Sequence, residues 1–179
     1  MARIVGYIAS SLDGFIAGHN DSLDWLTPKY DELLGPDYQR HYAEFIGRIR
    51  TTVMGRATYE WSAAHGSPSP CPDKRTIVVT SKRLAGAPAD IEIWREGVDA
   101  LAAHLRSLDD GDVWMVGGGR LQMAFLERGA LDEIEIFVIP EIIGGRTPLF
   151  PATGLRRTPR LISAQTLAAG CVRLHYGFD

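Results

Sequence analysis

Apolar residues along the chain gather in short runs that alternate with helix-like segments. Runs rich in branched apolar residues cover residues 3–10, 51–54, 75–79, 91–94, 112–116 and 131–139. Short apolar runs bounded by turn-forming residues are typical of buried strands. Segments with apolar residues at helical spacing follow or separate these runs, at residues 37–48, 98–108 and 120–128, and a further helical turn follows Gly55-Arg56.

Residues that start or stop regular structure set the expected boundaries. Asp37 follows Pro36 and is predicted to be the N-cap of its helix, and Gly129 is predicted to close the helix over 120–128. The segment Ser11–Asp24 contains two glycines and an Asn-Asp pair, so we expect a loop. Gly66–Asp73 holds three prolines and is predicted to be a surface loop.

The order of these elements predicts an α/β fold. Strands alternate with helices, and the chain ends in two strand-like runs, 161–167 and 171–178, that flank Ala168-Ala169-Gly170 as in a hairpin. We therefore expect a sandwich of helices on a mostly parallel sheet with an antiparallel C-terminal hairpin. No internal repeat is visible, and 179 residues are predicted to form a single domain over 1–179.

Composition and charge narrow the class of protein. The chain is 45% hydrophobic and 23% charged with a formal net charge of −3, which argues against a nucleic-acid partner. It has no apolar run of membrane-spanning length and no signal-peptide pattern, so we expect no membrane partner and a cytoplasmic location. Cys71 and Cys171 are expected to be reduced thiols, and five histidines without ligand spacing predict no metal.

Three predicted strands end in segments that suit an anion. They run into Gly55-Arg56, Thr80-Ser81-Lys82 and Gly117-Gly118-Gly119-Arg120. Ligands of open α/β sheets lie at the carboxyl ends of strands, where helix N-termini offer unpaired N–H groups. Each segment also has a purely structural interpretation, as a tight turn, a surface cation or a helix cap. Together they predict a site for a ligand that carries several phosphates, although G-x-G-x-x-G is not matched.

Five motifs, in order, carry a resemblance to a known family. They are SLDGFIAG (11–18), VMGRATYE (53–60), VVTS (78–81), VGGGRLQMAFL (116–126) and LDEIEIFVIPEIIGGRTPLF (131–150). With them the chain resembles the dihydrofolate reductase-like superfamily, in the branch of the C-terminal reductase domain of bacterial riboflavin biosynthesis enzymes (RibD). The resemblance implies a three-layer dihydrofolate reductase-like sandwich and an NADPH-dependent reductase.

The resemblance also implies which residues bind the cofactor. It places the pyrophosphate at the glycine turn, where the Gly117-Gly118 peptide is expected to be cis, and the adenosine 2′-phosphate near Thr80, where Lys82 could equally be a solvated surface lysine. The structural alternative for Ile16 is packing within its loop. The expected cofactor-binding residues are Ala9, Ile16, Ala17, Gly55, Arg56, Thr58, Thr80, Ser81, Lys82, Val116, Gly117, Gly118, Gly119, Arg120 and Leu121.

The sequence defines the substrate-binding and catalytic residues less fully than the cofactor-binding residues. Asp13 of SLDG is the expected catalytic residue, with turn capping as the equally weighted alternative. Asp24 and Trp25 are expected to contact substrate, although Trp25 also fits simple packing. Gln39 stands near the position of the pterin-binding carboxylate of dihydrofolate reductases, a departure that disfavours dihydrofolate itself. No set of cations for a ribose phosphate is evident.

These observations leave three functional hypotheses. The first is an NADPH-dependent reductase that transfers hydride to a small heterocyclic or carbonyl substrate. The alternatives are 5-amino-6-(5-phosphoribosylamino)uracil reductase of riboflavin biosynthesis and a nucleotide-binding module without turnover. Apolar residues over Ile134–Ile143 and the C-terminal hairpin suggest a homodimer contact, although core packing explains the same apolarity.

Overall fold

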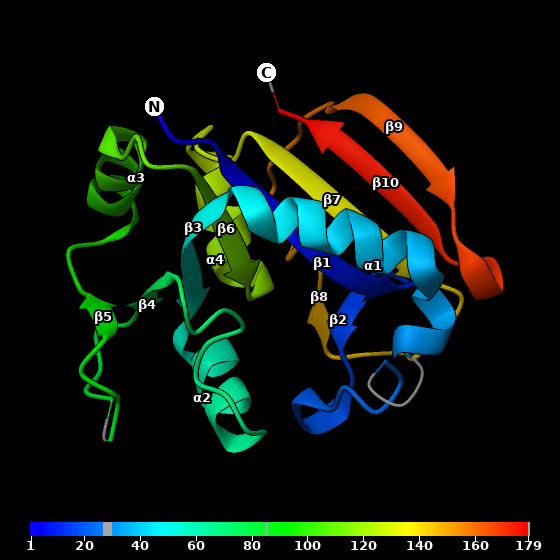
Figure 1. The fold of residues 1–179 in the computed structure, drawn as a ribbon, viewed down its shortest axis with the longest axis horizontal. Helices are drawn as coiled ribbons and strands as arrows, with labels where there is room; N and C mark the ends of the chain where they lie inside the picture. The colour runs from blue at the N-terminus through cyan, green and yellow to red at the C-terminus, as the bar shows by residue number, and fades with distance from the viewer. Residues whose placement is uncertain (27–29, 85, 179) are drawn as a thin grey trace.

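The described strands form one large sheet and a small two-stranded one. The computed structural model describes residues 1–26, 30–84 and 86–178, with the backbone alone over 30–34. Within these residues the large sheet contains β1 (Ile4–Ser11), β3 (Ile49–Gly55), β4 (Arg75–Val79), β5 (Ile91–Trp94), β6 (Asp112–Gly117), β7 (Glu133–Ile139), β9 (Arg160–Thr166) and β10 (Val172–Gly177). The order across the sheet is β5-β4-β3-β6-β1-β7-β10-β9 (Figure 1).

The sheet is parallel except at its C-terminal edge. Each neighbouring pair from β5 to β7 runs parallel, whereas β10 pairs antiparallel with both β7 and β9. The central parallel strands are apolar along most of their length because helices cover both faces. The predicted mostly parallel sheet with a C-terminal antiparallel hairpin is confirmed.

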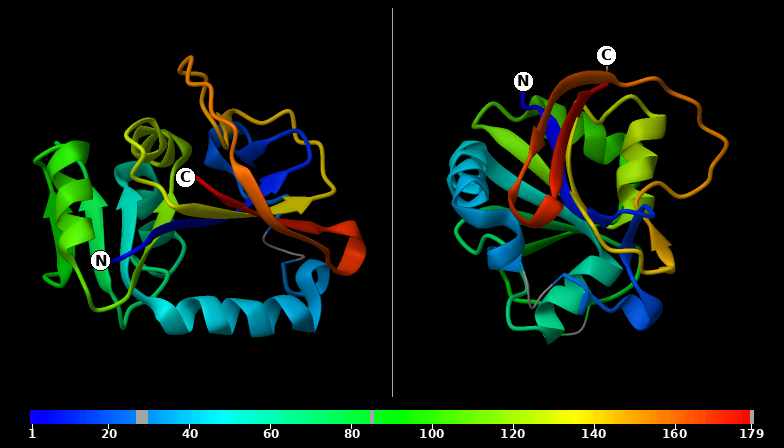
Figure 2. Two further views of the ribbon diagram at one scale, coloured as in Figure 1. Left: turned by 90° about the horizontal axis from the view of Figure 1, so that it is seen from above. Right: turned by 90° about the vertical axis from the view of Figure 1, so that its right-hand side faces the viewer.

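Two layers of helices enclose this sheet. On one face, Tyr7 and Trp114 pack with Phe45 of α1 (Tyr30–Arg48), and the Tyr7 and Phe45 ring centroids are 4.2 Å apart. On the other face, Ile4 and Met115 pack with residues of α3 (Val98–Ser107) and α4 (Gly119–Glu127). Figure 2 shows α1 and α4 on opposite sides of the sheet. The alternation of side chains along each strand therefore produces the three layers that the resemblance implies.

Two short elements lie inside the segment predicted to be a loop. Within Ser11–Asp24, β2 (Phe15–Ala17) pairs with β8 (Thr147–Pro148), and η1 (His19–Asp21) follows. The loop prediction therefore holds for part of this segment, and these two short elements were not predicted. Strands of two or three residues leave little periodic signal in the sequence, and this pair forms because two distant segments meet.

The predicted cap of α1 is also wrong. Asp37 lies inside the helix, which the structure begins at Tyr30, and Gly35 interrupts it with φ 66°. Pro36 therefore occupies the first position after the break, where its missing N–H has no cost. Asp37 follows in the first turn, and its carboxylate pairs with Arg40.

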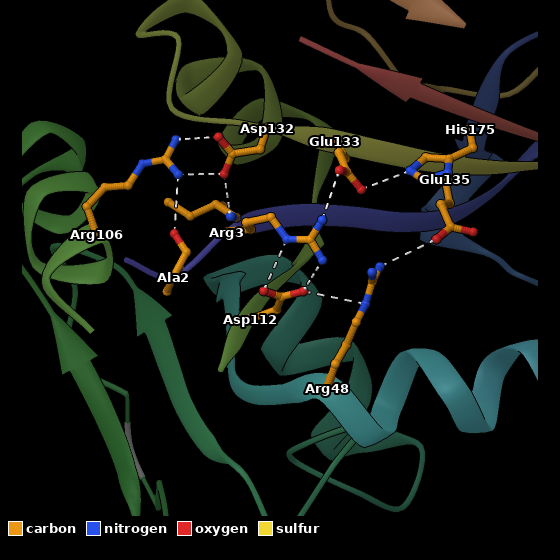
Figure 3. Close-up of polar contacts among 10 residues, drawn as sticks. Ala2, Arg3, Arg48, Arg106, Asp112, Asp132, Glu133, Glu135 and His175 are labelled. Atoms are coloured by element: carbon orange, nitrogen blue, oxygen red, sulfur yellow. Dashed lines mark hydrogen bonds and ion pairs between the residues drawn. The ribbon is translucent and has the colours of Figure 1, made fainter. Parts of the chain in front are cut away.

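A network of ion pairs joins the amino ends of the central strands, opposite the predicted site (Figure 3). Arg3 binds Asp112 at 2.9 Å and Glu133 at 3.0 Å. Arg106 makes two short contacts with Asp132, at 2.6 and 2.7 Å. These contacts connect β1, β6, β7 and α3 at the end of the sheet that carries no predicted site residue.

The most buried charge of the described residues is the carboxylate of Glu135 on β7, which is 2% exposed. Burial opposes its ionisation, but Arg173 Nε at 2.6 Å and His41 Nε2 at 2.6 Å hold its pKa below the usual value. Removal of one partner from such a buried pair is strongly destabilising. Glu135 is therefore a structural residue that fixes α1 and β10 to the centre of the sheet.

Both cysteines are buried free thiols, as predicted. Burial raises the pKa of Cys71 and of Cys171, so neither thiol is activated as a nucleophile. Within the described part of the chain, no three histidine, cysteine, aspartate or glutamate side chains gather as metal ligands. None of the helices described is long and apolar enough to cross a membrane.

Candidate functional site

The three strand ends that the sequence singles out lie next to one another. They belong to β4, β3 and β6, which are consecutive in the sheet. Gly55 pairs with Val79, and Met54 pairs with Gly117, so the parallel strands end at nearly the same level. The segments after Val79, Gly55 and Gly117 consequently share one edge of the sheet, as predicted.

The glycine turn connects β6 directly to α4. The Gly117-Gly118 peptide is cis, as the resemblance implies. Gly118 is the N-cap of α4, and its carbonyl oxygen accepts the N–H groups of Leu121 and Gln122. A Cβ atom on Gly118 would lie 3.4 Å from Thr58 Oγ1. The turn and the start of α2 (Arg56–Ala64) therefore face each other closely.

Gly119 is required for a different reason. A Cβ atom there would lie 2.6 Å from the carbonyl oxygen of Pro148 and 3.1 Å from that of Leu149. Both distances are shorter than van der Waals contact, and both atoms belong to backbone that cannot move aside cheaply. Gly119 thus allows the β8 segment to cross directly over the start of α4.

A groove of about 240 Å³ opens beside these segments. Its walls come from the end of β1, from β2, from the first turns of α2 and from the end of β6, together with the 21–26 segment and β8. The residues that line it are Ile8, Ala9, Ile16, Ala17, Asp21, Leu23, Leu26, Ala57, Thr58, Trp61, Val116, Gly118 and Thr147. The groove brings together six of the predicted cofactor-binding residues, including Thr58 and Gly118.

A cation follows each of the three strand ends within three residues. Arg56 begins α2, and its Nε lies 2.5 Å from Glu60 Oε1 in the next turn. Lys82 and Arg120 are exposed and make no ion pair within the described residues. Thr80 is buried, and its Oγ1 accepts the backbone N–H of Lys82, so the segment after β4 is a hydroxyl-capped bend instead of a helix start. The structure thus leaves two cations available to an anionic ligand.

Asp13 ties two loops together. Its Oδ1 accepts the Ser11 hydroxyl at 2.6 Å and the Ile143 N–H at 3.2 Å, and its Oδ2 accepts the Gly144 N–H at 2.8 Å. The bond from Ser11 is the largest cause that lowers the pKa of Asp13, followed by those from the two backbone amides. These contacts give Asp13 a structural role beside the groove, and its assignment as catalytic stays a prediction.

The three predicted substrate residues do not come together. Asp24 lines a cavity next to the groove. Trp25 packs against the aromatic cluster under α1, and its indole N–H is buried without a hydrogen-bond partner in the described residues. Gln39 is exposed on α1 and lines neither the groove nor that cavity. Asp24 is thus the predicted substrate residue that the structure brings beside the groove.

Several lining residues were absent from the sequence prediction. Trp61 lies three residues after Thr58 on α2, so helical spacing could have placed it on the same face. Ile8 directly precedes Ala9 on β1. Thr147 and Leu23 reach the groove through the β2–β8 pairing and the η1 segment, and no pattern in the sequence predicted either contact.

The chain belongs to the family of RibD C-terminal domains, which it matches over residues 3–173. It is 33% identical over 174 residues to the uncharacterized protein YwjB of Bacillus subtilis strain 168, with 97% of each chain covered. It is 25% identical to the uncharacterized protein YyaP of the same strain, with 99% of this chain and 95% of the relative covered.

Solved structures agree on the fold. A protein of Shewanella sp. PV-4, named for riboflavin biosynthesis, superposes with a TM-score of 0.84 at 23% identity and covers 100% and 99% of the two chains. Dihydrofolate reductase of Enterococcus faecalis, solved with NADP(H), gives a TM-score of 0.67 at 20% identity over 99% and 96%. Acinetobacter baumannii RibD gives 0.71 at 17% identity and is covered over 58% of its length. The dihydrofolate reductase-like fold is therefore confirmed.

Proposed function

We propose that this protein is an NADPH-dependent reductase that transfers hydride to a small heterocyclic or carbonyl acceptor. The observation that carries the proposal is that three strand ends lie side by side at one edge of the sheet, where a groove runs from the glycine turn to Ala9, Ile16 and Ala17. Membership of the RibD C-terminal family and the likeness to a reductase solved with NADP(H) support the same class.

The residues at this edge fit the chemistry of a dinucleotide phosphate. The N-termini of α2 and α4 and the side chain of Thr58 face one another where Gly118 has no Cβ to fill the space. Helix N-termini attract anions, and a close backbone approach needs glycine. Arg56 and Arg120 would balance the diphosphate, and Thr80, Ser81 and Lys82 would bind the 2′-phosphate.

The apolar end of the groove fits the nicotinamide. Ala9, Ile16, Ala17 and Val116 would hold the ring and exclude water from its reacting face. NADPH supplies the hydride when it is bound, and the protein contributes position and environment. Asp13 keeps β2 in place by fastening its loop to residues 143–144.

The test is a titration of the purified protein with NADPH and NADH, followed by nicotinamide oxidation with a panel of acceptors. We expect NADPH to bind at least about tenfold more tightly, since a 2′-phosphate adds charge-assisted hydrogen bonds. Equal affinities, or no binding of either nucleotide, would contradict the proposal. Tight NADPH binding without turnover would favour the nucleotide-binding module. Turnover of 5-amino-6-(5-phosphoribosylamino)uracil would favour the riboflavin-pathway reductase.

We also propose a homodimer that forms through β9. The apolar residues of β7 are explained by burial, since Ile134, Ile136 and Ile139 are each at most 8% exposed. β9 is different because it is the outer strand of the sheet, and Leu161 and Ile162 are 52% and 40% exposed. An outer strand with exposed apolar side chains is suited to pairing with another chain. Light scattering after size-exclusion chromatography should give twice the chain mass, and a monomer would contradict this.

A further inference from the structure

A second cavity adjoins the groove. It has a volume of about 630 Å³ and lies between the η1 segment, α2 and residues 65–70. The η1 segment and α2 lie side by side at one end of the molecule (Figures 1 and 2). Asp21, Leu23 and Trp61 line both spaces, so a ligand could extend from the groove into this polar cavity. The volume is in the range of small-molecule sites.

Among the described residues that line the polar cavity, both acidic side chains are carboxylates that can only accept hydrogen bonds. The carboxylates of Asp21 and Asp24 both line it. His65 Nδ1 lies 2.8 Å from the carbonyl oxygen of Trp61, which can only accept, so Nδ1 is the donor. In the neutral ring Nε2 then carries a lone pair. The polar cavity therefore suits a ligand with N–H or O–H donors.

No lysine or arginine is found among the described residues that line the polar cavity. Among these described residues a phosphate dianion would meet two carboxylates and no lysine or arginine, and like charges repel even when water screens them. Among the described residues, no side-chain hydrogen bond or ion pair balances the charge of Asp24. The electrostatics of the polar cavity thus disfavour phosphate esters.

Trp61 forms the wall between the groove and the polar cavity. Its indole stacks on the His65 ring, with centroids 4.1 Å apart and planes 13° from parallel. Stacking and the hydrogen bond from His65 Nδ1 to the Trp61 carbonyl oxygen hold the two rings together one helical turn apart. A flat, partly apolar surface therefore stands at the junction where a hydride acceptor would lie.

We propose that the polar cavity binds the distal part of an unphosphorylated, neutral or cationic hydride acceptor, whose donor groups bond to Asp21 and Asp24 and whose ring lies against Trp61. This proposal rests on the proposed function for the identity of the ligand as a hydride acceptor, whereas the preference for unphosphorylated ligands depends on the polar cavity alone. It separates this chain from a reductase of phosphoribosyl substrates.

The test compares pairs of compounds that differ by one phosphate. Cytidine and cytidine 5′-monophosphate form one pair, and 5-amino-6-ribosylaminouracil and its 5′-phosphate form the other. Each compound is titrated by calorimetry into protein saturated with NADPH, which occupies the phosphate sites of the groove. We expect the unphosphorylated member of each pair to bind about tenfold more tightly or better, as repulsion by two carboxylates requires. Asp24→Asn should remove much of this preference.

The matched control is Asp90→Asn, which makes the same charge change at an exposed residue before β5 and should keep the preference. Equal or tighter binding of the phosphorylated members, or no binding of any of the four compounds, would overturn the proposal. Failure of the proposed function is seen separately, as failure of NADPH itself to bind. In that case the same pairs are titrated into the cofactor-free protein, and the same preference is expected.

Discussion

Replacement of Glu60 by glutamine should tighten NADPH binding. Glu60 Oε1 holds Arg56 Nε at 2.5 Å at the start of α2, where a ligand phosphate is proposed to bind. Both side chains are partly exposed, at 37% and 49% for Arg56 and Glu60. A bound phosphate must therefore compete with the Glu60 carboxylate for Arg56 and is also repelled by it.

The expected size of this effect follows from the exposure of the pair. Exposed ion pairs one helical turn apart are worth about 0.3–0.5 kcal/mol. The loss of repulsion between Glu60 and the phosphate adds a similar amount at low salt, so the total is about 0.5–1 kcal/mol. The dissociation constant for NADPH should then fall by about two- to fivefold in the Glu60→Gln variant, and the gain should shrink as salt is raised.

A double-mutant cycle identifies the cause. NADPH is titrated by fluorescence against the parent protein, Glu60→Gln, Arg56→Gln and the double variant at fixed ionic strength. Because about half of the expected gain arises from the Arg56–Glu60 ion pair and the rest from direct repulsion, removal of Glu60 should gain about half as much in the Arg56→Gln background. Glu127→Gln, at the far end of α4, is the control for net charge. Weaker binding by Glu60→Gln, or an equal gain in both backgrounds, would refute this reasoning.

Three further substitutions test other parts of the structure. Gly119→Ala should lower the free energy of unfolding by about 1–3 kcal/mol, because the new Cβ would meet the Pro148 carbonyl. The control Gly47→Ala, at a helix position with open space around it, should not lower the free energy of unfolding. Thermal denaturation of both variants measures the difference. Glu135→Gln should cost about 3 kcal/mol at neutral pH. The native pKa of Glu135 is lowered, so its stabilisation is present above the unfolded value and is lost as pH falls through the native one; a deficit that persists in acid would contradict this. If Asp13 only holds the two loops together, Asp13→Asn should retain more activity than Asp13→Ala, because an amide oxygen still accepts the N–H groups of Ile143 and Gly144. Equal and complete loss of turnover in both variants would instead support a catalytic carboxylate.

The strands of the sheet could be predicted well because burial leaves a direct trace in the sequence. The apolar runs at Arg75–Val79 and Ile91–Trp94 are bounded by turn-forming residues, and both strands have the predicted limits. The glycine turn was also predictable, since a strand end, a helix start and three glycines coincide there. These features depend on residues that are neighbours in the chain.

The remaining walls of the site depend on contacts that no local pattern encodes. β2 and β8 are short strands that form by pairing with each other, although about 130 residues separate them along the chain. The backbone at the edge of the polar cavity has positive φ at Asn20 and Asp21, 56° at each. Positive φ is uncommon for residues other than glycine, so it is not predicted at these two positions. Gln39 shows the limit of counting along the chain, because this position falls on the exposed side of α1 and its assignment as a substrate residue stays a prediction.

The pairing of β2 with β8 has a consequence for protein engineering. The carbonyl of Ala17 accepts the Arg146 N–H, that of Gly14 accepts the Leu149 N–H, and a Cβ on Gly145 would lie 2.6 Å from the Ala17 oxygen. A loop graft from a relative that replaced residues 11–17 alone would meet a mismatched counterpart at 143–149. Chimeras that aim to change ligand preference should exchange the two segments as a unit.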